Sequence, residues 1–148
     1  MKKIILIVAI LTTSFVQSQI LDPVKWTTSV NKISSSEVEL IATATIEANW
    51  HLYSQNVPED GPIPTSFTFE GNGNYLKKGN TAEEKGHVIN DPVFEMKIKF
   101  FEEKAIFKQR IKLKTKKPFK INAIVEFMAC DDSRCLPPTE ADLVFSVK

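Results

Sequence analysis

The sequence predicts an all-β protein with the fold of an immunoglobulin-like antiparallel β-sandwich. Apolar residues recur at every second position through most of the chain, which is the period of a strand with one buried face. Segments rich in proline, glycine and asparagine separate these runs. Eight or nine such strands without a long helix favour a sandwich of two antiparallel sheets.

The clearest strand is expected at residues 38–46, where Val38, Leu40 and Ala42 begin a regular alternation with outward-facing positions. The other strands are predicted, in chain order, at residues 27–33, 50–53, 65–70, 87–90, 94–101, 107–113, 121–129 and 141–147. Each of these runs is short enough to be a strand and is bounded by turn residues.

Turn chemistry separates the strands. Residues 58–64 carry three prolines and a glycine, and residues 71–74 read Gly-Asn-Gly-Asn, a strong turn sequence. Only residues 81–85 are predicted to be briefly helical. The large aromatic side chains of Trp26 and Trp50 are assigned to the core between the sheets.

The N-terminus predicts export. Two lysines precede an unbroken apolar run at residues 4–11, and Ser18 supplies the small residue expected just before a cleavage site. Roughly 20 apolar residues are needed to span a bilayer, so this run predicts a cleaved signal peptide at residues 1–18. Residues 19–148 then form a single domain in the periplasm or another exported location, with no membrane span after cleavage.

The charge of the chain is nearly balanced. It has 19 lysines and arginines against 18 acidic residues, a formal net charge of +1. This balance gives no reason to expect nucleic acid or an anionic membrane as a partner. A basic cluster, Lys112, Lys114, Lys116 and Lys117, alternates along a strand-like segment and predicts a solvated sheet edge that resists aggregation.

The chain has two cysteines, Cys130 and Cys135, separated by four residues and followed by Leu-Pro-Pro. Closing so small a ring restricts the unfolded chain by only about 2 kcal/mol, whereas a stabilising bridge normally joins distant segments. In an exported protein the pair is therefore better suited to switching between dithiol and disulfide. Its position between the last two predicted strands places it at an exposed hairpin end.

The charges between the cysteines predict different roles for the two sulfurs. Asp131 and Asp132 are expected to raise the pKa of Cys130 by repulsion between like charges, whereas Arg134 favours the thiolate of Cys135. Because the thiolate is the reactive form, Cys135 is predicted to exchange with partners and Cys130 to resolve the mixed disulfide.

Other interpretations of the cysteines remain open. They include a structural disulfide that closes the hairpin, two inert thiols, and a zinc site completed by His51 and His87. The leading hypothesis needs no metal and no organic cofactor. The alternative class of function is a non-catalytic binding or scaffolding β-sandwich of the cell envelope with a structural hairpin disulfide.

Residues 128–140, Met-Ala-Cys-Asp-Asp-Ser-Arg-Cys-Leu-Pro-Pro-Thr-Glu, resemble the active-site segment of a known family. It is the N-terminal periplasmic domain family of the thiol:disulfide interchange protein DsbD. Residues 50–55, Trp-His-Leu-Tyr-Ser-Gln, and 63–67, Ile-Pro-Thr-Ser-Phe, resemble early strands of the same family. The resemblance covers essentially the whole chain after the signal peptide, and the cysteine segment is its specific part.

The resemblance implies an immunoglobulin-like domain whose cysteine pair carries electrons. They would come from a membrane-embedded thiol reductase and pass to thioredoxin-like exported proteins, including disulfide isomerases and cytochrome c maturation factors. In the family the second cysteine forms the mixed disulfide, which here is Cys135. This possible thiol:disulfide oxidoreductase role agrees with the charge argument.

The resemblance also implies a cap loop with an aromatic residue over the pair, expected at residues 91–95 with Asp91 and Phe94. Phe94 equally fits the inward-facing series of the strand predicted at 94–101, so cap and core interpretations both stand. Tyr53 and His51 are candidates to line the site, with a packed aromatic and a surface histidine as the alternatives.

Two features depart from the family. Its familiar members have one more residue between the cysteines than this chain. They also continue into a membrane domain and a thioredoxin-like domain, whereas this sequence ends at Lys148. The expectation is therefore that a separate membrane protein reduces the pair, or that the domain has moved to another use.

Overall fold

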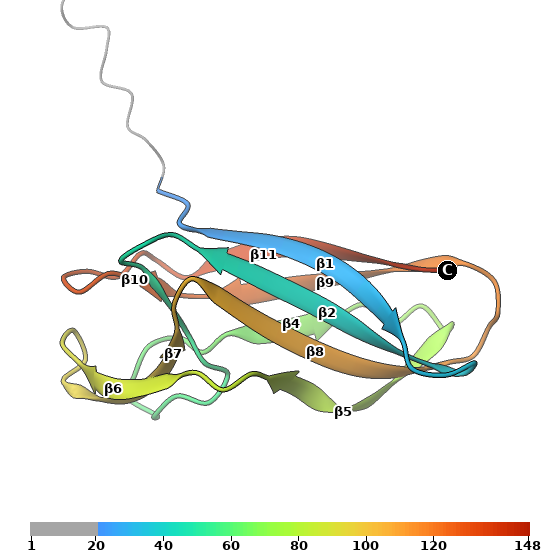
Figure 1. Ribbon diagram of the computed structural model, residues 1–148, viewed down its shortest axis with the longest axis horizontal. Coiled ribbons are helices and arrows are strands. Elements are labelled where there is room, and N and C mark those ends of the chain that lie inside the picture. Colours follow the sequence, from blue (N-terminus) through green and yellow to red (C-terminus); the bar gives the residue numbers. More distant parts are fainter. Residues whose placement is uncertain (1–20) are drawn as a thin grey trace, which may run out of the picture.

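The computed structural model describes residues 21–148, and all regular structure in that range is β-strand (Figure 1). The strands are β1 (Val24–Lys32), β2 (Glu37–Ile46), β3 (His51–Tyr53), β4 (Ser66–Phe69), β5 (Tyr75–Glu83), β6 (His87–Asp91), β7 (Met96–Phe101), β8 (Lys104–Leu113), β9 (Phe119–Phe127), β10 (Ala129–Cys130) and β11 (Thr139–Val147). This confirms the predicted all-β class. Within residues 21–148 there is no helix able to cross a membrane.

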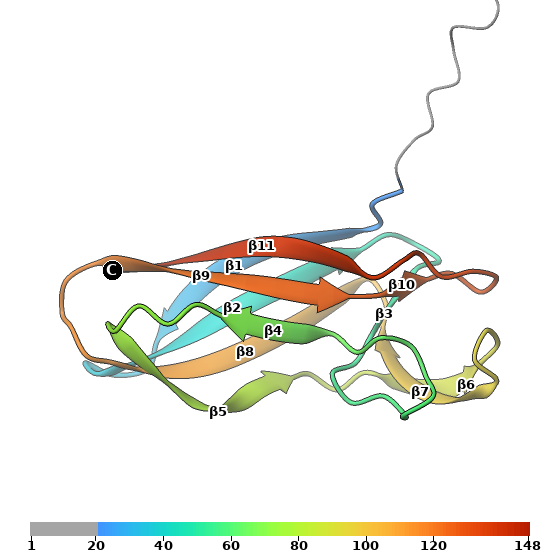
Figure 2. The same ribbon diagram turned by 180° about the vertical axis from the view of Figure 1, so that it is seen from behind.

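The strands form a sandwich with an extension at one end. One sheet has the order β1-β2-β8-β5 and the facing sheet the order β11-β9-β4. A third sheet, β10-β3-β7-β6, continues from one end of the sandwich, at the left of Figure 1 and the right of Figure 2. Every pairing between strands is antiparallel, which confirms the predicted architecture.

The main core lies between the two sheets of the sandwich. Phe107 on β8 is at its centre and contacts the rings of Trp26 at 5.8 Å and Phe67 at 5.0 Å between centroids. Trp50 is buried in this core, as predicted, while Trp26 is half-buried at its margin. Side chains alternate between buried and exposed along β2 and β9, because successive residues of a strand face opposite sides.

The helix predicted at residues 81–85 is wrong, because β5 runs through to Glu83. Its polar sequence has no clear alternation, yet Ala82 and Glu83 pair with β8. The register shifts between Lys78 and Ala82, where Gly79 has a positive φ of 68°. The backbone pairing with β8 therefore decides the conformation against a weak local preference.

The basic cluster is not a sheet edge. Lys112 lies on β8, which has β2 on one side and β5 on the other. Lys114, Lys116 and Lys117 follow it in the loop between β8 and β9. The edges of the sandwich sheets are instead β1, β5, β11 and β4.

The signal peptide predicted at residues 1–18 lies outside the described residues. The assignment of residues 19–148 to one domain stays a prediction.

Candidate functional site

Cys130 and Cys135 form a disulfide across a hairpin turn at one end of the molecule. Cys130 ends β10, and Cys135 pairs with it as an isolated antiparallel bridge. On either side of the disulfide the backbone is hydrogen-bonded: Asp131 N donates to Arg134 O and Leu136 N to Ala129 O, each at 2.9 Å. Strand β10 before the turn and the bridged backbone after it thus hold the two sulfurs at bonding distance.

Asp131 organises the turn itself. Its Oδ1 accepts hydrogen bonds from Ser133 N at 2.9 Å, Ser133 Oγ at 2.8 Å and Arg134 N at 2.8 Å. The backbone hydrogen bond from Ser133, followed by the one from its side chain, lowers the pKa of Asp131 to about 2. The carboxylate is therefore ionised at neutral pH and fixes the loop that separates the cysteines.

The charged side chains of the turn interact with each other and with a nearby aromatic ring. Arg134 Nε lies 3.4 Å from Asp131 Oδ2, and its guanidinium lies 6.0 Å from the centre of the Trp50 ring. Asp132 is exposed. The proposed effects of these three charged residues on the thiol pKa values stay predictions, because both cysteines are in the disulfide.

The two sulfur-bearing residues differ in burial. Cys130 is fully buried and Cys135 is half-buried, while residues 132–134 at the tip of the turn are exposed. The predicted exposed hairpin end is correct for the tip and for part of Cys135, but wrong for Cys130. Cys135 is therefore the more accessible of the two cysteines.

A small aromatic core, separate from the main one, encloses Cys130. Its buried members are Tyr53 on β3 and Ile98 and Phe100 on β7. Half-buried side chains complete the cover, namely Val57, Phe94, Met96, Met128 and Cys135. Burial among these apolar groups explains why Cys130 is inaccessible although it lies next to an exposed turn.

Phe94 lies in the turn between β6 and β7, not in a strand. Strand β7 begins only at Met96, and Glu95 just before it has a positive φ of 54°. The Phe94 ring meets Tyr53 edge-on with 5.9 Å between centroids and packs on the cluster that holds both cysteines. Phe94 thus departs from the strand alternation that the sequence suggested, and its role as a cap stays a prediction.

Asp91 links the turn that carries Phe94 to Tyr53 through hydrogen bonds. It is 1% exposed, and its Oδ1 accepts hydrogen bonds from Val93 N at 2.9 Å and Phe94 N at 3.1 Å. Its Oδ2 accepts a hydrogen bond of 2.7 Å from the hydroxyl of Tyr53, which is fully buried. One carboxylate therefore shapes the turn that carries Phe94 and ties it to Tyr53 beneath.

His51 is buried, which overturns its interpretation as a surface histidine. It is 5% exposed and pairs with Cys130 in the β3–β10 register, and its ring is tilted against that of Phe100 with 4.7 Å between centroids. Its Nε2 lies 3.2 Å from the Tyr53 hydroxyl oxygen. Because Tyr53 donates its own proton to Asp91, we assign the proton of neutral His51 to Nε2, which donates to Tyr53.

The sequence contained a signal for part of this network. His51 and Tyr53 are two residues apart on one strand and so share a face.

Burial lowers the pKa of His51, although the charge of Asp91 opposes the shift. Burial, followed by the hydrogen bond to Asp91, raises the pKa of Tyr53. Both side chains are therefore neutral near pH 7.

The lowered pKa of His51 makes stability depend on pH. The unfolded chain takes up a proton at pH values near 6.5, where the folded protein does not, so the free energy of unfolding falls as the pH drops below about 6.5. We expect wild type to lose more stability between about pH 7.5 and pH 5 than His51→Gln does, as measured by urea unfolding. The exposed His87 supplies the control: His87→Gln should keep the wild-type slope. A slope unchanged in His51→Gln would contradict the assignment.

Removing the aromatic cover is expected to speed reduction of the disulfide. Phe94→Ala opens the approach to the half-buried Cys135, so we expect reduction by dithiothreitol to be about tenfold faster than in wild type. Val93→Ala is a matched control because Val93 is exposed on the same turn. Equal rates in Phe94→Ala and wild type would show that Phe94 does not shield the sulfurs.

The zinc alternative gains no support. Among residues 21–148, no group of three or more histidine, cysteine or acidic side chains is placed to hold a metal ion. The cysteines share a disulfide, so neither is a thiolate ligand in this state. His87 is exposed on β6, and its ring lies 6.3 Å from that of Phe100.

The fold and the site define an immunoglobulin-like domain. Its disulfide joins two cysteines five positions apart and packs against the turn that carries Phe94. The family model described as the N-terminal domain of the thiol:disulfide interchange protein DsbD matches residues 17–146. The chain belongs to this family. Among curated proteins, none matches the sequence.

Two solved structures are similar in fold. The N-terminal periplasmic domain of ScsB from Proteus mirabilis is 12% identical with a TM-score of 0.63, covering 89% of this chain and 49% of that one. The chain thus spans about half the length of that structure. The N-terminal domain of Neisseria meningitidis DsbD in the reduced form is 13% identical with a TM-score of 0.56, covering 86% and 90%. These likenesses confirm the immunoglobulin-like fold.

Proposed function

We propose that this chain is an exported thiol–disulfide exchange module. It takes reducing equivalents from a membrane-embedded thiol reductase and passes them to thioredoxin-like exported proteins. The observation that carries the proposal is the asymmetric disulfide, with Cys135 reachable and Cys130 buried beneath the Phe94 turn. Membership of the DsbD N-terminal family supports the same chemistry. The signal peptide proposed at residues 1–18 would deliver the domain at residues 19–148 to the periplasm.

Reduction of the disulfide proceeds by two exchange steps. A thiolate of the donor attacks Cys135 Sγ, the bond between Cys130 and Cys135 breaks, and Cys130 leaves with the electron pair and takes up a proton. The donor's second thiol then attacks the mixed disulfide and releases Cys135. The donor becomes a disulfide, and this protein gains two electrons and two protons.

Delivery to the acceptor reverses these steps. The thiolate of Cys135 attacks the acceptor disulfide, and Cys130 resolves the mixed disulfide, so the acceptor leaves as a dithiol. His51 is the register partner of Cys130, and in antiparallel pairs such side chains lie about 5 Å apart at Cβ. Burial keeps this histidine neutral, and its hydrogen bond to Tyr53, which in turn donates to Asp91, orients it beside the buried sulfur.

An exchange assay tests the proposal. The reduced protein is mixed with an oxidised thioredoxin-fold protein, and the thiols of both are alkylated and separated by size at successive times. We expect the acceptor to be reduced while the Cys130–Cys135 disulfide reforms, and Cys135→Ser to abolish transfer. Retention of both thiols here, with the acceptor still oxidised, would favour the alternative of a binding or scaffolding domain with a structural disulfide.

A further inference from the structure

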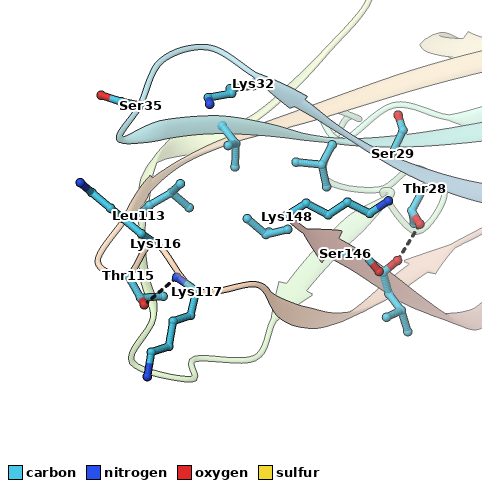
Figure 3. Close-up of a pocket in the computed structure, with 14 residues that line it drawn as sticks. Thr28, Ser29, Lys32, Ser35, Leu113, Thr115, Lys116, Lys117, Ser146 and Lys148 are labelled. Atoms are coloured by element: carbon cyan, nitrogen blue, oxygen red, sulfur yellow. Dashed lines mark hydrogen bonds between the residues drawn. The ribbon is translucent and has the colours of Figure 1, made fainter.

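A second concave site lies at the end of the sandwich opposite the disulfide. It is a groove of about 810 Å³ between the final residues of β1, the loop after β8 and the end of β11 (Figure 3). In Figure 1 this is the end marked C, while β10 and the cysteine turn lie at the other end. A ligand in the groove therefore leaves the cysteine site free.

Two unpaired strand edges border the groove. β1 is the outer strand of one sheet and β11 the outer strand of the other, and they run side by side (Figures 1 and 2). The Thr28 hydroxyl donates a hydrogen bond of 2.6 Å to Val144 O and links the two strands at one point. Beyond that point, residues 29–32 and 145–148 line or flank the groove without pairing to each other in the described structure. Unpaired edges of this kind are templates for an extended peptide.

The groove is strongly basic. Four exposed lysines line it, namely Lys32, Lys116, Lys117 and Lys148. No acidic side chain contributes to the lining, and within residues 21–148 none of the four lies within 4.0 Å of a carboxylate. Lysines without an acidic partner favour an anionic ligand.

The interior of the groove is partly apolar. Val30, Val38, Leu113 and Val147 contribute to its lining, and the hydroxyls of Ser29 and Ser146 lie along the strand edges (Figure 3). A recessed apolar lining with a rim of lysines suits a narrow segment that alternates acidic and apolar side chains. A planar bilayer surface cannot enter such a groove.

We propose that the groove binds an extended acidic segment of a partner protein as an added strand against β1 or β11. The peptide backbone pairs with a free edge, its carboxylates meet the lysines, and its alternate side chains enter the apolar interior. This site goes beyond the proposed exchange function and does not depend on it. Where the segment belongs to a redox partner, attachment at this end raises the effective concentration of that partner at the cysteines.

Peptide binding tests the proposal directly. The probe is a fluorescent peptide of about six residues that alternates glutamate and valine, measured by anisotropy against the whole domain. We expect binding that weakens about tenfold in Lys116→Glu/Lys117→Glu and that falls with added salt. The matched control, Lys85→Glu/Lys104→Glu, makes the same charge change at exposed lysines outside the groove and should bind as wild type does.

Further measurements identify the mode of binding and the chemistry of the ligand. Hydrogen exchange should slow at backbone amides of residues 29–32 or 144–148 when the peptide binds, whereas unchanged exchange would refute strand addition. Equal affinity for a glutamine–valine peptide would refute the role of charge. Binding to phosphatidylglycerol vesicles, with no binding of the acidic peptide, would assign the lysines to a membrane and overturn the proposal. Thermal unfolding of each variant checks that it is folded.

Discussion

Cys130→Ala is expected to accumulate a mixed disulfide between Cys135 and a thioredoxin-like partner. The substitution removes the buried resolving thiol and leaves the reachable sulfur in place. The partner should carry alanine at its own second active-site cysteine, so that neither protein resolves the intermediate. Under these conditions we expect most of the limiting protein to be found in the mixed species.

The reciprocal variant is the matched control. Cys135→Ala keeps only Cys130, which lies beneath Tyr53 and Phe100. Its mixed disulfide should form at least about tenfold more slowly, because an enclosed thiol is both poorly accessible and poorly ionised. Wild type should show no lasting adduct, since Cys130 resolves it. Equal trapping by both single variants would contradict the assigned roles, and no trapping by either would remove support for exchange with this partner.

The second large effect is expected from Asp91→Ala. This change removes the acceptor for two backbone amides of the Phe94 turn and for the buried hydroxyl of Tyr53. A buried donor left unpaired, here the Tyr53 hydroxyl, costs about 1–3 kcal/mol, and the two amides of the partly exposed turn add less. We therefore expect the free energy of unfolding to fall by about 3 kcal/mol. Urea unfolding of the oxidised protein measures the loss.

Asp91→Asn is the matched control for this prediction. The amide oxygen of the asparagine still accepts hydrogen bonds from the backbone of the Phe94 turn. Its amide nitrogen can donate to the hydroxyl oxygen of Tyr53, which also accepts hydrogen bonds. The loss should therefore be clearly smaller than for Asp91→Ala. Asp91→Ala should also speed reduction by dithiothreitol, because the turn that carries Phe94 loses its attachment. A stability within about 0.5 kcal/mol of wild type would contradict the role given to Asp91.

The fold was accessible from the sequence because its strands obey a simple physical rule. Strands β2 and β9 have one face in the core, so their apolar residues alternate visibly. Strand β5 was missed since nearly all of its residues are exposed or half-buried, and its conformation depends on pairing with β8. Such pairing joins segments far apart in sequence and leaves no local pattern.

The site was only partly accessible for the same reason. The cysteines are neighbours in sequence and could be predicted as a pair. The bond between Tyr53 and Asp91 joins residues 38 positions apart, and neither position indicates the other. Phe94 fitted the alternation of the following strand, and only the turn fixed by Asp91 takes it out of that strand.

The lysines after β8 show how local composition and spatial arrangement differ. As a segment, they indicate a solvated edge, which is the common role of such residues. In the folded protein two of them, Lys116 and Lys117, meet Lys32 and Lys148 from distant parts of the chain around one groove. Charge that is ordinary along the sequence becomes concentrated in space, which is why a binding role emerges only from the structure.

The reduction potential of the Cys130–Cys135 pair tests the central claim, that this disulfide opens and closes in normal function. It is measured by equilibrating the domain with glutathione or dithiothreitol buffers of known potential and alkylating the free thiols. An exchanging pair is expected between about −250 and −180 mV, in the range of thioredoxin-like exchange proteins. A potential below about −300 mV, the range of structural disulfides, would contradict the proposed function.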